Sequence, residues 1–314
     1  MKGFISISLK FIGFLVPVFI VIFIIWSSVP VLRNTSNIRF TEDQFSSLRL
    51  KELKKVNNID ILFIGSSLCY RGFDTRIFKK YGYNTFNVGT SSQTPMQTKY
   101  LLKQYLKKLN PKLVIYSIDP FVSSIGSGVE SATNIISNRY LSDSLTIQMV
   151  NEQNDIKVYN TFAYCFLRNK LLIDNNQIGT DKTQKYIPGG YVEKMITYYK
   201  YDNPPSIKYN FDGKQLNALK EITHYLKRYN QDFFFVFPPI TSGRYKSISN
   251  SIYFVESIKM FGDLYNFNGK VGLDDSLHFY DDRHLNQRGV EIYNHKLLEV
   301  LGVKINTIIK RDKK

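Results

Sequence analysis

Short apolar runs alternate with amphipathic segments along much of the chain. The runs at 61–64, 113–116 and 233–237 are rich in branched and aromatic residues and end at Gly, Ser or Pro, which is typical of buried parallel strands. Between them, apolar residues recur at helical spacing. In the segment 95–109, Thr94 can cap a helix whose first residue is proline. The alternation of strand and helix predicts an α/β fold with a parallel sheet and right-handed crossovers.

Shorter segments extend this pattern on both sides of a long interruption. Short strands are expected at 83–88, just before Gly89, and at 264–267. Further helices are expected at 216–229, 247–261 and 290–301. Residues 121–210 lose the pattern and are rich in Ser, Gly, Asn and Tyr, although 160–167 can form a helix. We interpret 121–210 as an insertion at the carboxyl edge of the sheet, where specificity usually resides.

The N-terminus carries a nearly unbroken apolar run, residues 11–29, preceded by Lys2 and Lys10. Its length suits a bilayer span, which takes about 20 residues. A cleaved signal peptide is the alternative, but no Ala-x-Ala site follows, and the run exceeds the roughly 7–15 residues of a signal core. We expect an uncleaved single-pass anchor within 1–33 and a polar tether that contains a short helix over 34–57. The simplest topology then places the following domain outside the membrane.

Composition and charge narrow the choice of function. The 314 residues are 43% hydrophobic, which is typical of a globular protein. We expect one α/β domain over 58–302 and a solvated basic tail at 303–314. The net charge is +16, but the basic residues are scattered. Binding to nucleic acid is therefore disfavoured, and attraction to an anionic envelope surface or polymer fits the charge at least as well. Cys69 and Cys165 predict free buried thiols.

Two polar blocks are candidates for chemistry. Gly65-Ser66-Ser67 follows the first strand, at the strand end where open α/β sheets place their sites. Asp281-Asp282-Arg283-His284 precedes the last helix. A serine hydroxyl needs a positioned imidazole to act as a nucleophile, and a carboxylate to orient that imidazole. The spacing favours Ser67, His284 and Asp281 as a triad, with Asp282 as the alternative orienting carboxylate.

Other interpretations of these residues were weighed. Gly-Ser-Ser alone is typical of a flexible turn. His278 with Asp281, Asp282 and His284 could hold a divalent metal, but no second ligand group lies near Ser67 in the sequence, so we expect neither a metal nor a cofactor. The Gly-x-Ser-x-Gly motif of α/β-hydrolases is absent around this serine. The remaining histidines lie in amphipathic segments and are expected to be structural: His224 and His295.

Together the two blocks resemble those of the SGNH (GDSL-type) hydrolase family. In that family the nucleophile is the serine of a Gly-Asp-Ser block, and the base comes from an Asp-x-x-His block. The first block here has Ser66 in place of aspartate, and the last matches 281–284. The resemblance covers roughly 58–119 and 211–302. It implies a three-layer α/β/α doubly wound sheet.

The resemblance also implies an oxyanion hole. The backbone N–H groups of Ser67 and Gly89, the glycine of the second block, are its expected donors. The third block, Gly-x-Asn in the family, reads Ser117-Ile118-Asp119. An ionised carboxylate repels an oxyanion, so Asp119 assists only if it is protonated or does a different job. The alternative is an ordinary Asp-Pro turn.

Resemblance and anchor together imply a serine esterase or O-acyltransferase. Its substrates would be small acyl esters, with acetyl favoured, of cell-envelope glycans such as exopolysaccharide, peptidoglycan or teichoic acid. Such proteins often work beside a multi-span membrane O-acyltransferase, here an expected partner. The expected location is the bacterial inner membrane, with the domain on the periplasmic or extracellular side. The first alternative is a catalytically silent SGNH-like module that binds glycan or scaffolds an assembly. A lipase would need an apolar acyl channel, which polar residues 121–160 do not suggest.

Overall fold

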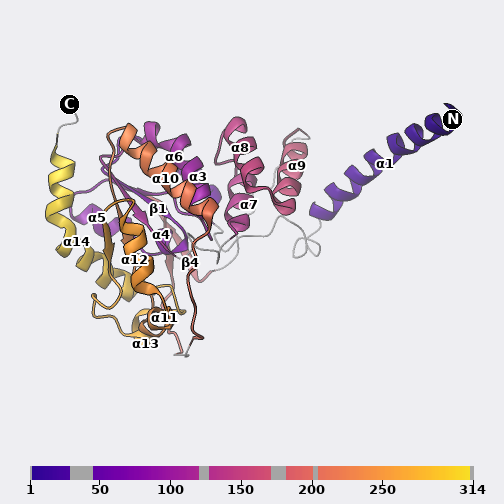
Figure 1. Cartoon of the computed structure of the whole chain (residues 1–314). Helices are drawn as coiled ribbons and strands as arrows, with labels where there is room; N and C mark the ends of the chain where they lie inside the picture. The colour runs from indigo at the N-terminus through magenta and orange to yellow at the C-terminus, as the bar shows by residue number, and fades with distance from the viewer. Residues whose placement is uncertain (1, 29–44, 120–126, 171–181, 201–203, 312–314) are drawn as a thin grey trace.

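The centre of the molecule is a five-stranded parallel sheet (Figure 1). The structure, a computed structural model, describes residues 2–28, 45–119, 127–170, 182–200 and 204–311. The sheet comprises β1 (Ile61–Gly65), β2 (Thr85–Asn87), β3 (Leu113–Ser117), β6 (Asp232–Phe237) and β7 (Leu264–Asn266). The strand order is β2-β1-β3-β6-β7, and each neighbouring pair is parallel. This confirms the predicted α/β fold and parallel sheet.

Helices cover both faces of the sheet, because alternate side chains of a strand point to opposite sides. Leu62 and Ile64 of β1 pack on one side and Ile61 and Phe63 on the other, and all four are buried. The first face is covered by α6 (Pro95–Leu109), α10 (Gly213–Arg228) and α12 (Ser251–Lys259). The second face is covered by α5 (Thr75–Lys80) and α14 (Gln287–Lys310). The three-layer arrangement follows from these two cores.

The strand order changes direction beside β1. From β1 the chain passes to β2 on one side, and then crosses β1 to reach β3 on the other. The carboxyl ends of β1 and β3 are therefore neighbours, with Gly65 opposite Ser117 in the register. Loops leave such a point in opposite directions and open a crevice, which is where α/β sheets bind ligands.

Helix boundaries agree with the sequence at α6 and differ at the segment 247–261. Thr94 and Gln97 form a capping box before Pro95, as the cap signal predicts. The helix expected over 247–261 is present as the shorter α12, which begins at Ser251 because α11 (Ser242–Ser247) ends before it and Ile248 between them is extended. Ile248 is still buried, whereas Ile252, expected on the same face, is 79% exposed.

The short helix expected within 34–57 is α3 (Ser46–Leu53). It packs onto the domain, with Leu50 and Leu53 in the core. Arg49 of this helix is fully buried and donates hydrogen bonds to the carbonyl oxygens of Gly89 and Gly190 at 3.1 and 3.0 Å. A buried arginine needs such partners, and these bonds fix α3 to the domain. Residues 34–44 of the expected tether lie outside the described residues.

The last helix continues past position 302, after which a basic tail was expected. Helix α14 continues to Lys310, and Ile305 and Ile308 are buried against the second face of the sheet. Their spacing continues the apolar stripe of Leu297 and Leu301. Helix α14 therefore includes residues 303–310, which lie beyond the domain boundary expected at 302.

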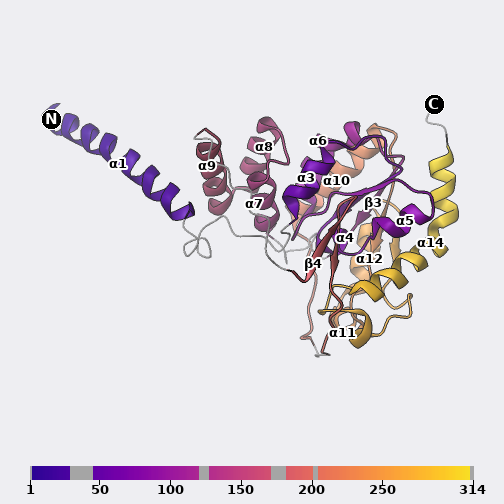
Figure 2. The same cartoon turned by 180° about the vertical axis from the view of Figure 1, so that it is seen from behind.

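The described part of the insertion contains three helices and a hairpin. Helices α7 (Val129–Ser137), α8 (Asp143–Gln153) and α9 (Ile156–Lys170) stand at one end of the sheet domain (Figure 2). The helix expected at 160–167 is confirmed within α9. The hairpin of β4 (Gln184–Ile187) and β5 (Tyr191–Lys194) lies beside β2, where Asn87 N donates to Gly189 O at 2.7 Å. Three segments of the insertion lie outside the described residues: 120–126, 171–181 and 201–203.

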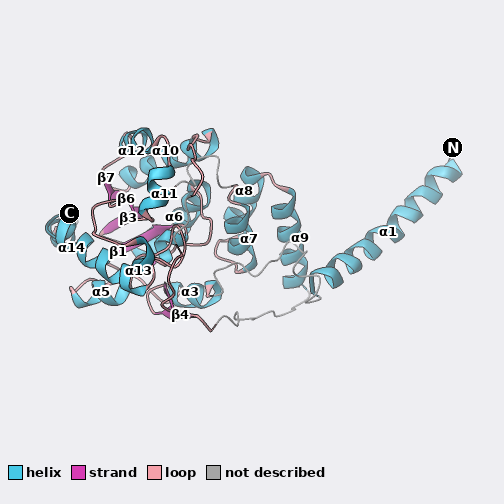
Figure 3. Ribbon diagram, turned by 90° about the horizontal axis from the view of Figure 1, so that it is seen from below, coloured by secondary structure: helices cyan, strands magenta, loops and turns pink. Residues whose placement is uncertain are grey.

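The N-terminal helix α1 (Lys2–Ser28) extends away from the sheet domain (Figure 3). Its apolar stretch Gly3–Ile22 is long enough to cross a membrane, and none of it is buried. It is either a membrane anchor or a signal sequence. Elsewhere, Cys69 and Cys165 are buried free thiols, as predicted.

Candidate active site

The turn after β1 presents Ser67 at the carboxyl end of the sheet. Gly65 has φ of +153°, and a Cβ there would lie 2.6 Å from Ser117 O, so only glycine fits. The buried Ser66 caps α4 (Ser67–Tyr70), accepting from Leu68 N at 3.3 Å. Ser67 is thereby held as the first residue of the helix, and it is only half-buried.

A tight loop before α14 carries the imidazole. The loop is closed by a bridge between Phe279 and Leu285, and Tyr280 N donates to His284 O at 3.1 Å. Directly after the loop, the buried Asn286 caps α14 through Gly289 N. Its amide also donates to the carbonyl oxygens of Thr197 and Leu277, at 3.1 and 2.9 Å. These contacts fix the loop over the carboxyl end of the sheet.

The structure brings Ser67, His284 and Asp281 together. His284 Nε2 lies 2.8 Å from Ser67 Oγ, across 217 positions of sequence. His284 Nδ1 lies 2.8 Å from Asp281 Oδ2, so the base has an orienting carboxylate behind it. Asp281 Oδ1 also accepts from the backbone N–H groups of Arg283 and His284, at 2.8 and 2.7 Å. The arrangement is that of nucleophile, base and orienter.

The surroundings of Asp281 favour the ionised form of its carboxyl group. Burial raises its pKa, but the hydrogen bond and charge of His284 and the two backbone N–H groups of Arg283 and His284 outweigh this, so the pKa lies below its ordinary value. An ionised Asp281 accepts from His284 Nδ1–H and leaves Nε2 to accept a proton from Ser67. This is the tautomer that general-base catalysis needs.

Tyr280 and Arg71 flank the base, and sequence reasoning missed both. The Tyr280 ring stacks on the His284 imidazole, with centroids 5.4 Å apart and planes 5° from parallel. The guanidinium of buried Arg71, four residues after Ser67, lies 5.9 Å from the Tyr280 ring and 5.2 Å from the Tyr70 ring. Its position after the serine turn was the only signal of Arg71, and nothing in the sequence paired it with Tyr280.

Asp282, the alternative orienting residue, faces another partner. Asp282 Oδ2 lies 3.4 Å from Nε of the buried Arg244, and Oδ1 lies 3.8 Å from Nε of Arg283. The hydroxyl of Thr241, before α11, donates to Asp282 O at 2.9 Å. Asp282 thus fixes the loop to α11, and Asp281 is the carboxylate that contacts the imidazole. Arg244 lies too far along the sequence for this contact to be read from a motif.

Gly89 lies beside the serine turn, but its N–H has a partner of its own. A Cβ at Gly89 would lie 2.9 Å from Ser66 O, so glycine lets the loop after β2 pass close to the turn. Gly89 N donates to Asn87 Oδ1 at 3.0 Å, and Asn87 is held by Cys69 O at 2.8 Å. The expected role of Gly89 as an oxyanion donor would require this hydrogen bond to open.

Asp119 contacts the serine next to the candidate nucleophile. Ser66 Oγ donates to Asp119 Oδ2, and both side chains are buried. The two residues at which the sequence differs from the SGNH blocks that it resembles, Ser66 and Asp119, are therefore hydrogen-bond partners. In this position Asp119 stabilises the serine turn through Ser66. The described hydrogen bond of Ser67 Oγ is to His284 and not to Asp119.

The remaining histidines lie apart from this site. His278 Nδ1 accepts from Asp274 N at 2.8 Å within its own turn. Among the described residues, no three His, Cys, Asp or Glu side chains are grouped to hold one metal ion. His224 and His295 are exposed on α10 and α14, and His295 Nδ1 lies 3.1 Å from the Tyr81 hydroxyl.

No protein-family model matches the chain, and no curated protein matches it. A function must therefore be inferred from the residues and their geometry.

Proposed function

We propose that the chain is a membrane-anchored SGNH-like serine esterase or O-acyltransferase. Its substrates would be small acyl esters, with acetyl as the first candidate, on cell-envelope glycans. The observation that carries this proposal is the 2.8 Å contact between His284 Nε2 and Ser67 Oγ, with Asp281 on the opposite ring nitrogen. Serine, imidazole and carboxylate in this order activate a hydroxyl for attack on an acyl carbon.

In the first half-reaction the ester transfers its acyl group to Ser67. His284 Nε2 takes the hydroxyl proton while Ser67 Oγ bonds to the acyl carbon and the carbonyl π electrons move to oxygen. Ionised Asp281 stabilises the imidazolium that forms. The tetrahedral intermediate then re-forms its carbonyl, the bond to the alcohol oxygen breaks, and His284 gives that oxygen its proton. An acyl-serine and a free alcohol result.

The second half-reaction reverses these steps with a different acceptor. Water or a glycan hydroxyl loses its proton to His284 as its oxygen attacks the acyl-serine carbon. Release of Ser67, which recovers its proton from His284, gives an acid or a new ester. Hydrolysis and transfer share one intermediate, so the acceptor decides between esterase and transferase.

Backbone N–H groups supply the stabilisation of the oxyanion in this proposal. An N–H at the first position of a helix has no intrahelical acceptor, and Ser67 occupies that position in α4. Gly89 N–H would join it once released from Asn87. Loss of one oxyanion donor typically costs about 10²–10³-fold in turnover.

The cellular setting is proposed from α1 and the net charge. An uncleaved α1 would anchor the chain in the bacterial inner membrane, with the domain on the periplasmic or extracellular side. A net charge of +16 favours an anionic envelope polymer as the glycan. Acyl groups would reach that side of the membrane through a multi-span membrane O-acyltransferase, the proposed partner.

Hydrolysis of p-nitrophenyl acetate by the full chain in detergent tests the chemistry. We expect measurable turnover that falls at least about a thousandfold in Ser67→Ala and in His284→Ala. Ser249→Ala, a surface serine outside the site, is the matched control and should leave turnover unchanged. Equal turnover in wild type and both site variants would contradict the assignment.

A silent SGNH-like module that binds glycan or scaffolds an assembly is the second candidate. Two observations favour it: Gly89 N–H is bonded to Asn87, and a carboxylate stands where the family has an oxyanion-binding amide. The two candidates differ in cells. The enzyme proposal expects Ser67→Ala to abolish the chain's contribution to glycan acylation, and the silent module expects that contribution to survive.

A further inference from the structure

One face of α9 carries an uninterrupted apolar stripe that is exposed. Ile156 and Phe166 are 71% and 54% exposed, and Tyr159 and Ala163 between them are also exposed. These positions follow the i, i+3, i+7, i+10 spacing that places side chains on one side of a helix. The opposite side of α9 is buried against the other helices of the insertion through Val158 and Tyr164.

Charge distinguishes this stripe from other exposed apolar residues. Within α9 the charged residues are Lys157, Arg168 and Lys170, all basic. On α12, by contrast, the exposed Ile252 and Met260 are separated by the ion pair of Glu256 and Lys259. Asp155, directly before α9, has an acidic side chain that accepts from Lys157 N and Val158 N and so caps the helix. An apolar face flanked by basic residues suits the headgroup region of an anionic bilayer.

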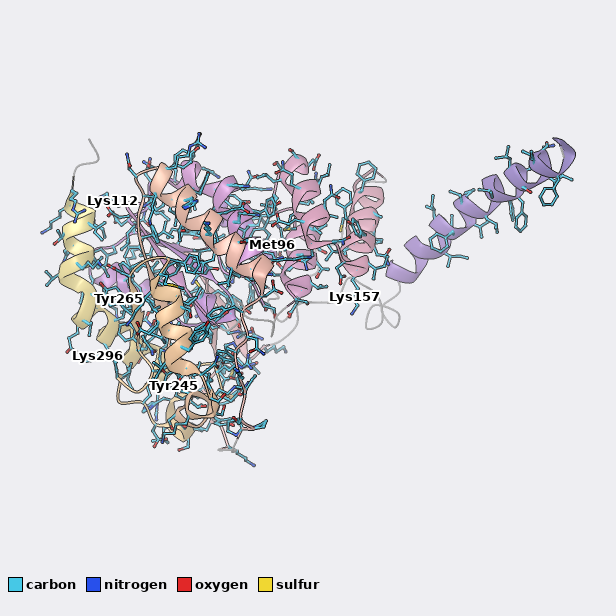
Figure 4. All side chains as sticks on the ribbon, in the orientation of Figure 1. Met96, Lys112, Lys157, Tyr245, Tyr265 and Lys296 are labelled. Carbon is cyan, nitrogen blue, oxygen red and sulfur yellow. The ribbon has the colours of Figure 1, made fainter. Side chains whose placement is uncertain are left out.

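The position of α9 in the molecule also agrees with contact to a bilayer. Helix α9 is the helix of the domain that lies next to the end of α1 (Figures 1 and 2). Lys157 lies on the side of the molecule from which α1 departs (Figure 4). If α1 crosses the membrane, α9 is therefore delivered to the membrane surface.

We infer that α9 is a second membrane contact, which lies in the headgroup region of the leaflet that α1 enters. The apolar stripe Ile156–Phe166 would insert between lipids, and Lys157 would contact anionic headgroups. Such a contact would fix the orientation of the domain and of its crevice relative to the bilayer. This inference rests on the anchoring part of the proposed function and is independent of the acyl chemistry.

Tryptophan quenching by brominated lipids tests this with the full chain. Trp26 in α1 is the single tryptophan and reports on the anchor itself. In a Trp26→Phe background, Ile156→Trp and Tyr159→Trp report on α9. Val303→Trp, at an 82% exposed position of α14, is the matched control at the opposite end of the molecule. The vesicles contain phosphatidylcholine and phosphatidylglycerol, brominated near the headgroup end of the acyl chains.

We expect Trp26 and both α9 tryptophans to lose most of their fluorescence, and Val303→Trp to keep it. Adding Lys157→Glu should reduce the loss at position 156. If Trp26 is quenched while both α9 tryptophans behave like Val303→Trp, the second contact is refuted and the anchor stands. If Trp26 is not quenched, the anchor and the second contact are both refuted. Ester hydrolysis by the same proteins reports separately on the Ser67 site.

Discussion

At the level of single residues, Ser66 and Ser67 are neighbours with different partners. Ser67 Oγ faces the imidazole, whereas Ser66 Oγ is bonded to Asp119 and caps α4. One serine is thus available for chemistry, and the other holds the turn that presents it. Asp119 contacts the serine that holds the turn, Ser66.

Two substitutions of Asp119 separate its hydrogen bond from its charge. Asp119→Asn keeps an oxygen that can accept from Ser66, so stability should change little, and turnover should hold or rise because a negative charge near the oxyanion is removed. Asp119→Ala leaves the buried Ser66 hydroxyl without this acceptor, which should cost about 1–3 kcal/mol of stability. Urea unfolding and ester hydrolysis measure the two effects. A larger loss of turnover in Asp119→Asn than in Asp119→Ala would contradict this account.

Asp281 makes a prediction about pH. Its folded pKa is depressed, so its contribution to stability is present above the unfolded value of about 3.9 and is lost as pH falls through the lower folded pKa. The difference in unfolding free energy between wild type and Asp281→Asn should therefore be constant at neutral pH and shrink below pH of about 4. Urea unfolding over a pH series checks this. In a His284→Ala background the difference should become smaller, since His284 is a main cause of the depression.

At the residue scale, sequence indicates the groups with distinctive chemistry better than the groups that support them. Ser67, Asp281 and His284 could be named because strand ends and an Asp-x-x-His spacing are local patterns. Tyr280 and Arg244 could not, since a tyrosine or arginine has no signature until its tertiary neighbours are known. The partnership of Ser66 and Asp119 was also hidden, because it joins two strand ends that are adjacent only in the sheet.

At the level of elements, α3 connects the site to the start of the domain. Its Arg49 bonds the carbonyl oxygens of Gly89, beside the serine turn, and of Gly190, beside the hairpin. The cation also lies 4.8 Å from the Tyr70 ring of α4. Residues 46–53 are therefore part of the framework of the site.

Removing the hydrogen bonds of Arg49 in α3 should therefore destabilise the domain, including the loop after β2. Arg49→Met removes two hydrogen bonds to buried carbonyl oxygens, and each unsatisfied carbonyl costs about 1–3 kcal/mol. Thermal unfolding should show a clearly lower midpoint for Arg49→Met, whereas Lys51→Met, at an exposed position of the same helix, should be near wild type. An Arg49→Met protein as stable as wild type would contradict the role given to α3.

For the same helix, the sequence predicts a short helix within the tether but not its packing onto the domain. Strands β1, β3 and β6 were predictable, because parallel strands buried on both faces appear as continuous apolar runs. The segment Ser46–Leu53 contains Ser, Arg, Lys and Glu and is typical of a tether by composition. Its burial depends on partners for Arg49 that only the fold supplies. Likewise, Lys304 and Lys310 make the last turns of α14 similar in composition to a solvated basic tail.

At the scale of the whole molecule, the fate of α1 decides where the domain resides. An uncleaved anchor predicts that the chain stays in the membrane fraction after an alkaline carbonate wash and has its full mass of 36.6 kDa. A signal sequence predicts a soluble protein that lacks the α1 residues. Intact-mass spectrometry of the washed membranes distinguishes the two, and a shortened chain found only in the soluble fraction would contradict anchoring.

The central claim is that Ser67 is a nucleophile activated by His284. Its most direct test is to treat the full chain with a fluorophosphonate and map the modified residue by mass spectrometry. We expect one covalent adduct, on Ser67, that is absent from Ser67→Ala and strongly reduced in His284→Ala and after denaturation. An adduct elsewhere, or none on a folded wild-type chain under conditions that label a known serine esterase, would contradict the claim.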